Sequence, residues 1–256
     1  MEGRVSLPIT TKIVLWPKML WEFRGCEDPR LYKIAERFIM LYTGYGYMIR
    51  DKSYSSCIVQ AFALFEENYN CLQRNYFRIQ TLEGDLFLPR ANKDSAILNI
   101  DSSKVSMLMR PLIRDIEVGW FVRADLKDAV VYEESMSPSL AFEPWEIKVG
   151  WSTNVVKLSS NEYLVGWHGI FKEDYSYRNG LAIIDSDGNL LAISNYLLVP
   201  SGLVEEYGDR PLVIFGNGLI SYKEKLLWIG GVSDYAIGFF MTDLDNALEK
   251  IKWING

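Results

Sequence analysis

The chain has 256 residues, of which 49% are hydrophobic and 14% aromatic, and it carries a formal net charge of −6. This length allows one large domain or two small ones, and the abundant tyrosine and tryptophan favour a strand-rich protein. The negative charge argues against a general nucleic-acid binder, because such binding needs a basic surface.

Cysteine and histidine are too sparse for common metal sites. Cys26, Cys57 and Cys71 form no CxxC pair, and the chain has one histidine, so no ordinary zinc site is expected. No other metal or organic cofactor is indicated. A reduced, cytoplasmic setting is the simplest interpretation. Neither a signal peptide nor a membrane span is visible, so no membrane partner is expected.

Residues 25–30 read Gly-Cys-Glu-Asp-Pro-Arg and place two adjacent carboxylates before a proline. Pro29 fixes its own φ and biases Asp28 away from helical geometry, so we expect a stiff, extended turn. Such a turn can hold a carboxylate in one direction. Taken alone, an Asp-Pro turn beside Arg30 is more often a structural ion pair than a catalytic site.

Four hairpins follow in chain order, each made of short apolar strands around a polar turn. They cover residues 31–46, 95–110, 155–168 and 218–234. Two other segments are ambiguous. Residues 54–65 fit either a strand pair or a helix, and residues 244–254 have the spacing of a short closing helix.

The hairpins recur about every 60 residues, a spacing that favours a β-propeller, in which small sheets are arranged around one axis. A polar residue follows the second strand of each hairpin: Tyr45, Arg110, His168 and Asp234. In a propeller these positions converge on a common pocket. Each residue alone is more often a packed or solvated group.

These motifs resemble glycoside hydrolase family 130, whose members are five-bladed β-propeller enzymes that act on β-mannosides. Most are inverting phosphorylases, and some are hydrolases. The resemblance runs in the family's order from about residue 9 to the carboxyl end. It is carried by five segments: Glu27-Asp28-Pro29-Arg30, Met109-Arg110-Pro111, Lys148-Val149-Gly150, Trp167-His168-Gly169 and Gly231-Val232-Ser233-Asp234.

The resemblance implies roles for individual residues. Asp28 matches the family's catalytic acid, which passes its proton through a mannosyl hydroxyl to the glycosidic oxygen. The family's phosphate pocket matches Lys93, Arg110, Lys148 and His168.

Five further residues are candidates for contact with the sugar. Asp234 matches a sugar-binding carboxylate, and Glu205 matches a recurring acid whose role is open. Tyr177 is an aromatic residue that can stack on a sugar ring. Arg30 and Tyr45 complete the predicted substrate-binding set.

Phosphorolysis fits these residue types better than hydrolysis does. An inverting hydrolase needs a second carboxylate to activate water, whereas phosphate arrives already nucleophilic and needs cations to hold it. Several cations on separate strands repel one another without a ligand. Inorganic phosphate is therefore expected as a co-substrate, beside a β-mannoside or manno-oligosaccharide.

The sequence departs from the family pattern before residue 25, where family members have a complete first blade. We expect residues 1–256 to form a single all-β domain, a five-bladed propeller with a short or incomplete first blade. The ring is then incomplete, closed differently, or closed by a partner chain in a homo-oligomer.

Three functions are open. The leading hypothesis is an inverting β-mannoside phosphorylase, a glycosyltransferase-type enzyme that releases mannose 1-phosphate. The second is a β-mannosidase that uses water, with Glu205 as the candidate base. The third is a non-catalytic propeller for sugar binding or assembly.

Overall fold

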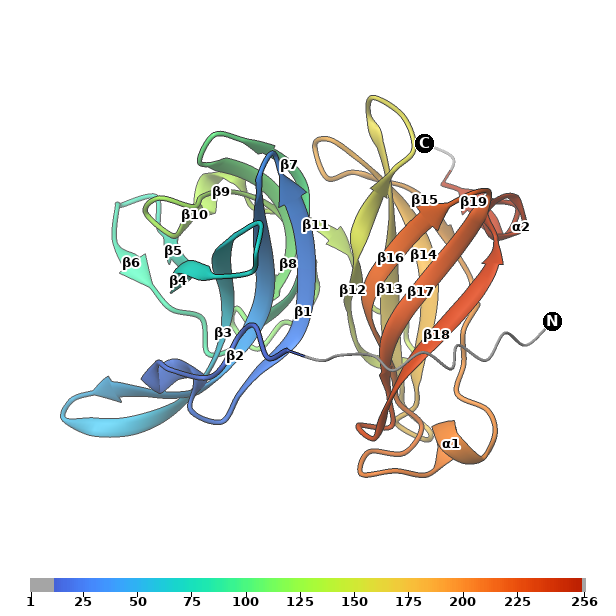
Figure 1. Cartoon of the computed structure of the whole chain (residues 1–256), viewed down its shortest axis with the longest axis horizontal. Helices are drawn as coiled ribbons and strands as arrows, with labels where there is room; N and C mark the ends of the chain where they lie inside the picture. The colour runs from blue at the N-terminus through green and yellow to red at the C-terminus, as the bar shows by residue number, and fades with distance from the viewer. Residues whose placement is uncertain (1–11, 255–256) are drawn as a thin grey trace.

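The computed structural model describes residues 12–254, which form an all-β protein of four sheets. The first sheet has the order β1-β2-β3-β4, and the second β6-β5-β10-β9-β8-β7 with β11 paired to β9. The third has the order β12-β13-β14-β15-β19, and the fourth β16-β17-β18. Figure 1 shows the first and second sheets, blue to green, in one half of the molecule and the third and fourth, yellow to red, in the other.

The strands and short helices have the following bounds: β1 (Gly25–Ile34), β2 (Arg37–Arg50), β3 (Ser53–Glu66), β4 (Cys71–Tyr76), β5 (Arg78–Gln80), β6 (Leu86–Phe87), β7 (Asn92–Asp101), β8 (Lys104–Pro111), β9 (Gly119–Asp125), β10 (Val130–Tyr132), β11 (Ser137–Leu140), β12 (Glu146–Lys157), β13 (Glu162–Phe171), β14 (Tyr177–Asp185), β15 (Leu190–Ser194), β16 (Ile214–Tyr222), β17 (Lys225–Val232), β18 (Ala236–Asp243), β19 (Ile251–Trp253), η1 (Leu20–Glu22), η2 (Glu133–Ser135), α1 (Leu203–Glu206) and α2 (Leu244–Leu248).

All four predicted hairpins are present, as the pairs β1-β2, β7-β8, β12-β13 and β16-β17. The polar turns therefore correctly predicted where the chain reverses direction. The ambiguous residues 54–65 belong to a single long strand, β3, which pairs with β2 along its whole length. The carboxyl-terminal segment holds the short helix α2, as expected, followed by the strand β19.

The first strand of each hairpin lies innermost. β7 contacts β1 and β12, and β16 contacts β12 and β1, so the four inner strands are neighbours in a cycle. The residues described by the structure supply four sheets around this cycle. A fifth blade stays a prediction.

Apolar side chains join each sheet to the next. One cluster links the first and second sheets, a second links the second and third, and another links the third and fourth. Val14, Leu15 and Trp21 cover the outer face of the first sheet. The fourth sheet differs, because β18 exposes a row of large apolar side chains: Ile237, Phe239 and Met241.

Every inner strand is interrupted by a β-bulge or a similar irregularity. The register shifts between Glu27 and Arg30 in β1, and between Lys93 and Ala96 in β7. Similar shifts occur within residues 151–155 of β12 and 216–218 of β16. A bulge re-aims a side chain without ending the strand. The four irregularities therefore turn polar residues out of the normal alternation near the centre of the molecule.

The expectation of an extended turn at Asp28 was wrong. Asp28 lies inside the strand β1, and its φ is +53°, in the left-handed region. Pro29 disfavours right-handed helical geometry for Asp28, and the bulge adopts a left-handed conformation instead of an extended one. Asp94 in the bulge of β7 has the same conformation, with φ +58°. Among residues 12–254, no helix is long and apolar enough to cross a membrane.

Candidate active site

Five of the predicted site residues line one cavity of about 450 Å³: Asp28, Tyr45, Lys93, Tyr177 and Asp234. They come from β1, β2, β7, β14 and the turn after β17. Side chains far apart in the sequence thus meet beside the inner strands. The lining also includes Glu27 and Gly231, from two of the five segments that carry the resemblance, and four residues that the sequence analysis did not name: Arg210, Val213, Phe215 and Asn217.

Asp28 faces the ammonium group of Lys93 across the cavity. Lys93 Nζ lies 3.9 Å from Asp28 Oδ2, and the Asp28 side chain is 21% exposed. Burial raises the pKa of the Asp28 carboxyl, and Lys93 opposes this shift only in part. The carboxylates of Asp94 and Asp234 push the pKa further upward. An acid in this setting keeps its proton to a higher pH than an exposed aspartate does, which is what proton donation to a leaving group requires.

Aromatic rings form one wall of the cavity. The Tyr177 ring stacks on the His168 ring, with centroids 5.3 Å apart and planes 24° apart. Phe215 packs against both, and Lys93 Nζ lies 5.6 Å from the centre of its ring. Tyr45 is held from the other side, because Arg24 Nη1 donates a 2.5 Å hydrogen bond to its hydroxyl. Such rings offer flat faces to a sugar.

Behind the cavity lies a buried ionic cluster centred on Asp94. Arg110 Nε donates a 2.6 Å hydrogen bond to Asp94 Oδ2, and His168 Nε2 lies 3.7 Å from the same oxygen. Arg110 and Lys93 are paired across β7 and β8, which places a second cation next to the carboxylate. Burial opposes ionisation of Asp94, but Arg110 and Lys93 together hold the pKa of its carboxyl well below its usual range.

His168 is an uncharged member of this cluster. Burial lowers the pKa of the imidazole to about 3, although Asp94 acts in the opposite direction. Its Nδ1 lies at hydrogen-bond distance, 2.8 Å, from Ser152 Oγ. At neutral pH the ring is therefore a neutral hydrogen-bonding group. The positive charge of the predicted phosphate site therefore comes from its lysine and arginine side chains.

Gly150 leaves the room that the cluster needs. A Cβ atom at this position would stand 2.4 Å from Asp94 Oδ2, 2.8 Å from His168 Cε1 and 2.9 Å from Arg110 Nε. Gly150 pairs with His168 across β12 and β13. Only glycine allows the three side chains to meet against the backbone here.

Glu117 connects Lys148, the last of the four predicted phosphate residues, to Arg110. Arg110 Nη1 donates a hydrogen bond to Glu117 Oε2, and Lys148 Nζ lies 3.7 Å from that oxygen. Burial lowers the pKa of the Lys148 ammonium, and the charge of Arg110 adds to this shift. The four predicted phosphate residues therefore form one continuous cluster, but two carboxylates, Asp94 and Glu117, lie among them.

Arg30 and Glu205 lie outside the cavity lining. Arg30 is buried, and its terminal nitrogens donate hydrogen bonds to the carbonyl oxygens of Ser95 and Trp151, at 2.7 and 2.8 Å. It thus ties β1 to β7 and β12 beneath the site and does not present its fork to a ligand. Glu205 lies on α1, where its carboxylate accepts a 2.6 Å hydrogen bond from the Ser201 N–H. Neither side chain therefore lines the cavity that holds the other predicted sugar contacts, and their contact with a sugar stays a prediction.

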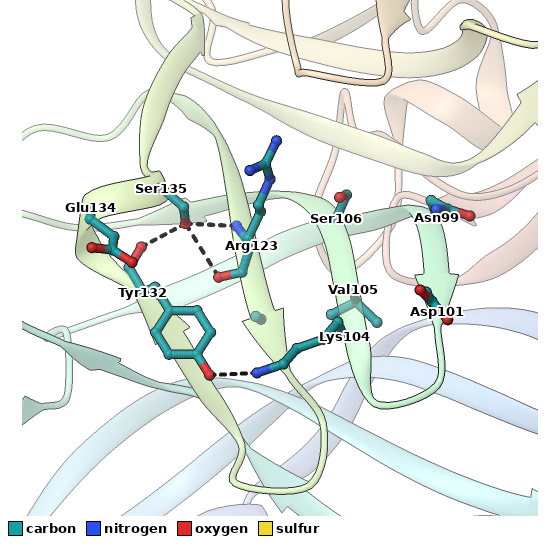
Figure 2. A pocket seen from close by; sticks show the side chains of 10 residues that line it. Asn99, Asp101, Lys104, Val105, Ser106, Arg123, Tyr132, Glu134 and Ser135 are labelled. Carbon is teal, nitrogen blue, oxygen red and sulfur yellow. Dashed lines mark hydrogen bonds between the residues drawn. The ribbon is translucent and has the colours of Figure 1, made fainter.

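A separate groove lies on the second sheet (Figure 2). Lys104 Nζ donates to the Tyr132 hydroxyl at 2.8 Å and lies 2.8 Å from Asp125 Oδ2. Ser135 Oγ bonds the backbone of Arg123 and Tyr132. The Lys104 and Ser135 side chains in this groove are thus bonded to their neighbours. Across residues 12–254, no three His, Cys, Asp or Glu side chains are placed to hold a metal ion.

Comparison with known proteins gives one consistent group of relatives. Residues 1–253 match the Glyco_hydro_130 family, described as beta-1,4-mannooligosaccharide phosphorylase. The chain is 24% identical over 228 residues to a 1,2-beta-oligomannan phosphorylase of Thermoanaerobacter sp. (strain X514), covering 87% of this chain and 70% of the relative. It is 26% identical over 257 residues to a beta-1,2-mannobiose phosphorylase of the same organism, covering 98% of this chain and 76% of the relative.

A solved structure has the same fold. The beta-1,2-mannobiose phosphorylase of Listeria innocua, solved in complex with beta-1,2-mannobiose, superposes with a TM-score of 0.73 at 20% identity. The match covers 94% of this chain but 64% of the Listeria chain. The chain thus spans less than two thirds of that enzyme's length.

Proposed function

Given that this chain belongs to glycoside hydrolase family 130, we propose that it is an inverting phosphorylase of β-mannosides. It would cleave a manno-oligosaccharide with inorganic phosphate and release mannose 1-phosphate. The characterised relatives act as phosphorylases on mannosides by their names, which supports this substrate class. Phosphate attacks the anomeric carbon from one face while the leaving oxygen takes a proton on the other, so the configuration inverts.

The observation that carries the proposal is the setting of Asp28. Its carboxyl opens onto the cavity, its pKa is raised by burial, and a single lysine stands 3.9 Å away. Asp28 is the group that gives its proton toward the glycosidic oxygen. Tyr45, Tyr177 and Asp234 surround the space in which the mannosyl unit would bind.

The phosphate end is assigned to Lys93, Arg110, Lys148 and His168. The two lysines and the arginine supply positive charge, and the neutral imidazole supplies a hydrogen bond. Asp94 holds Arg110 in position by a hydrogen bond. Its negative charge also offsets the repulsion between Arg110 and Lys93. No metal or organic cofactor takes part in the proposed reaction.

The finer architecture belongs to the same proposal. The four sheets would be blades of a five-bladed propeller whose first blade is short. The protein would work in the cytoplasm, and a second copy of the chain could complete the ring. Measurement of the molar mass by light scattering, at several concentrations, tests the last point.

The test is the reverse reaction, in which the enzyme makes a mannoside from mannose 1-phosphate and an acceptor sugar. The protein is incubated with mannose 1-phosphate and mannose, glucose or N-acetylglucosamine acceptors, and phosphate release is measured. We expect release, and a fall in kcat of roughly 10²- to 10⁴-fold in Asp28→Asn, which is the usual contribution of a general acid. Asp115→Asn is a matched control, because the Asp115 side chain is 86% exposed.

Two results would contradict the proposal. Release of mannose from β-mannosides without phosphate would indicate a hydrolase. Silence with every acceptor, together with unchanged behaviour of Asp28→Asn, would indicate a non-catalytic protein.

A further inference from the structure

The loop between β8 and β9 places an acid in the middle of the proposed phosphate site. Glu117 lies between Arg110 and Lys148, which are assigned to phosphate. Arg110 is 3% exposed, whereas the side chains of Glu117 and Lys148 are 25% and 31% exposed. The carboxylate therefore stands at the boundary between the buried cluster and solvent.

The position of Glu117 allows it to move without disturbing the sheet. β8 ends at Pro111 and β9 begins at Gly119, so Glu117 lies outside the strand ladder. The tip of the loop is closed separately, because Ile113 and Ile116 exchange backbone hydrogen bonds of 3.3 and 3.0 Å. Rotation of the Glu117 side chain breaks its contacts to Arg110 and Lys148 and none of these backbone bonds.

A carboxylate and a phosphate compete for the same donors. Both anions suit the planar fork of arginine, and both are attracted to a lysine ammonium. Arg110 Nε already donates to Asp94, and Glu117 occupies Nη1, a second nitrogen of the same guanidinium. A phosphate dianion that entered beside an unmoved Glu117 would meet a like charge at the same guanidinium.

We propose that Glu117 is a built-in competing anion, which occupies the phosphate position in the free protein and must swing out before phosphate binds. Glu117 thereby sets how much phosphate the enzyme needs. This inference rests on the proposed function in one respect, since it takes phosphate as the physiological anion. It assigns Glu117 no part in proton transfer.

The direct test measures binding and needs no turnover. Inorganic phosphate is titrated by calorimetry into the wild-type protein, Glu117→Gln, Glu117→Ala and the control Asp115→Asn. When the competent state is populated to a tenth or less, removing the competitor tightens the apparent Kd by about tenfold or more. We expect this gain in both Glu117 variants and none in Asp115→Asn. Thermal unfolding of each variant verifies that it is folded.

A kinetic measurement gives a second readout. The KM for phosphate should fall in Glu117→Gln by a factor close to the change in Kd, whereas a merely structural residue would alter kcat through loss of folded enzyme. Tighter phosphate binding without phosphorolysis would support this inference and contradict the proposed function. Phosphorolysis by the wild type with an unchanged or weaker Kd in both variants would overturn this inference alone.

Two other outcomes also overturn it. One is that phosphate binds neither the wild type nor either variant. The other is that wild-type protein releases mannose without phosphate and Glu117→Gln abolishes this release, because Glu117 would then activate water.

Discussion

The bulges of β1 and β7 each hold an aspartate in the same backbone conformation, but the pKa values of the two carboxyls are shifted in opposite directions. Asp28 and Asp94 have φ values of +53° and +58°, and burial disfavours the charge of both. Asp28 has one lysine at 3.9 Å, and its pKa is raised. Asp94 has the Arg110 guanidinium at 2.6 Å as well as Lys93, and its pKa is lowered. The hydrogen-bonded guanidinium of Arg110, and not the local fold, sets the two pKa values apart.

The largest test of this contrast removes the cation that most distinguishes Asp94. Arg110→Met leaves the Asp94 carboxylate buried without its hydrogen-bonded partner, which typically costs about 3–5 kcal/mol of unfolding free energy. Urea denaturation measures the loss. Arg90→Met is the control, because Arg90 pairs with Asp115 on the surface at 3.5 Å and exposed pairs contribute about 0–1 kcal/mol.

A double variant sharpens the same test. Asp94→Asn in the Arg110→Met background removes the stranded charge and should recover part of the lost stability. A loss below about 1 kcal/mol for Arg110→Met alone would mean that the cluster does not stabilise Asp94 as an anion.

A smaller effect is expected from crowding the cluster. Gly150→Ala places a methyl group against Asp94, His168 and Arg110, and overpacking of this kind costs typically about 1–3 kcal/mol. Gly231→Ala is the matched control on the cavity side, since a Cβ atom there meets no atom within 4 Å. Urea denaturation of the two variants compares the buried cluster with the open cavity directly. Equal losses would contradict the difference in packing.

The smallest effect is a dependence on pH. The pKa of His168 is lowered to about 3 in the folded protein from an ordinary value of 6.5. Below pH 6.5 the unfolded chain binds a proton that the folded protein does not, so stability falls as the pH falls. One such group gives a loss of about 1 kcal/mol between pH 6.5 and 5.5.

Comparison with His168→Gln isolates this contribution. The difference in unfolding free energy between wild type and variant should shift by that amount over the same range, because the other titrating groups are common to both. A difference that is constant with pH would mean that the imidazole of His168 has the same pKa in the folded and unfolded protein.

Much of the architecture followed from the sequence because hairpins are local. The polar turns and apolar runs indicated all four inner hairpins, and their even spacing indicated that the strand ends meet. Asp28, Lys93 and Asp234 do line one cavity. Residues 54–65 were ambiguous because the long apolar run of β3 has no turn signal inside it.

The site residues that sequence reasoning missed depend on bulges and on long-range contacts. Asp94 follows Lys93 directly, and regular alternation in a strand would point one of the two side chains to the opposite face of the sheet. The sequence contains no signal for the bulge that changes this. Glu117 reads as a solvated loop acid until Arg110 and Lys148 are placed beside it. The buried setting of Arg30 was not evident for the same reason, since its partners are carbonyl oxygens of Ser95 and Trp151 on other sheets.

The separation of the four irregularities has a consequence for how this protein can be altered. Each belongs to a different sheet, and the strand pairing resumes on both sides of it. A substitution at one of them changes a single wall of the central site while the other three walls keep their register. Under the proposed function, contacts to the nucleophile and contacts to the sugar can therefore change in separate steps. Each intermediate variant keeps the fold, which offers a route to new specificities.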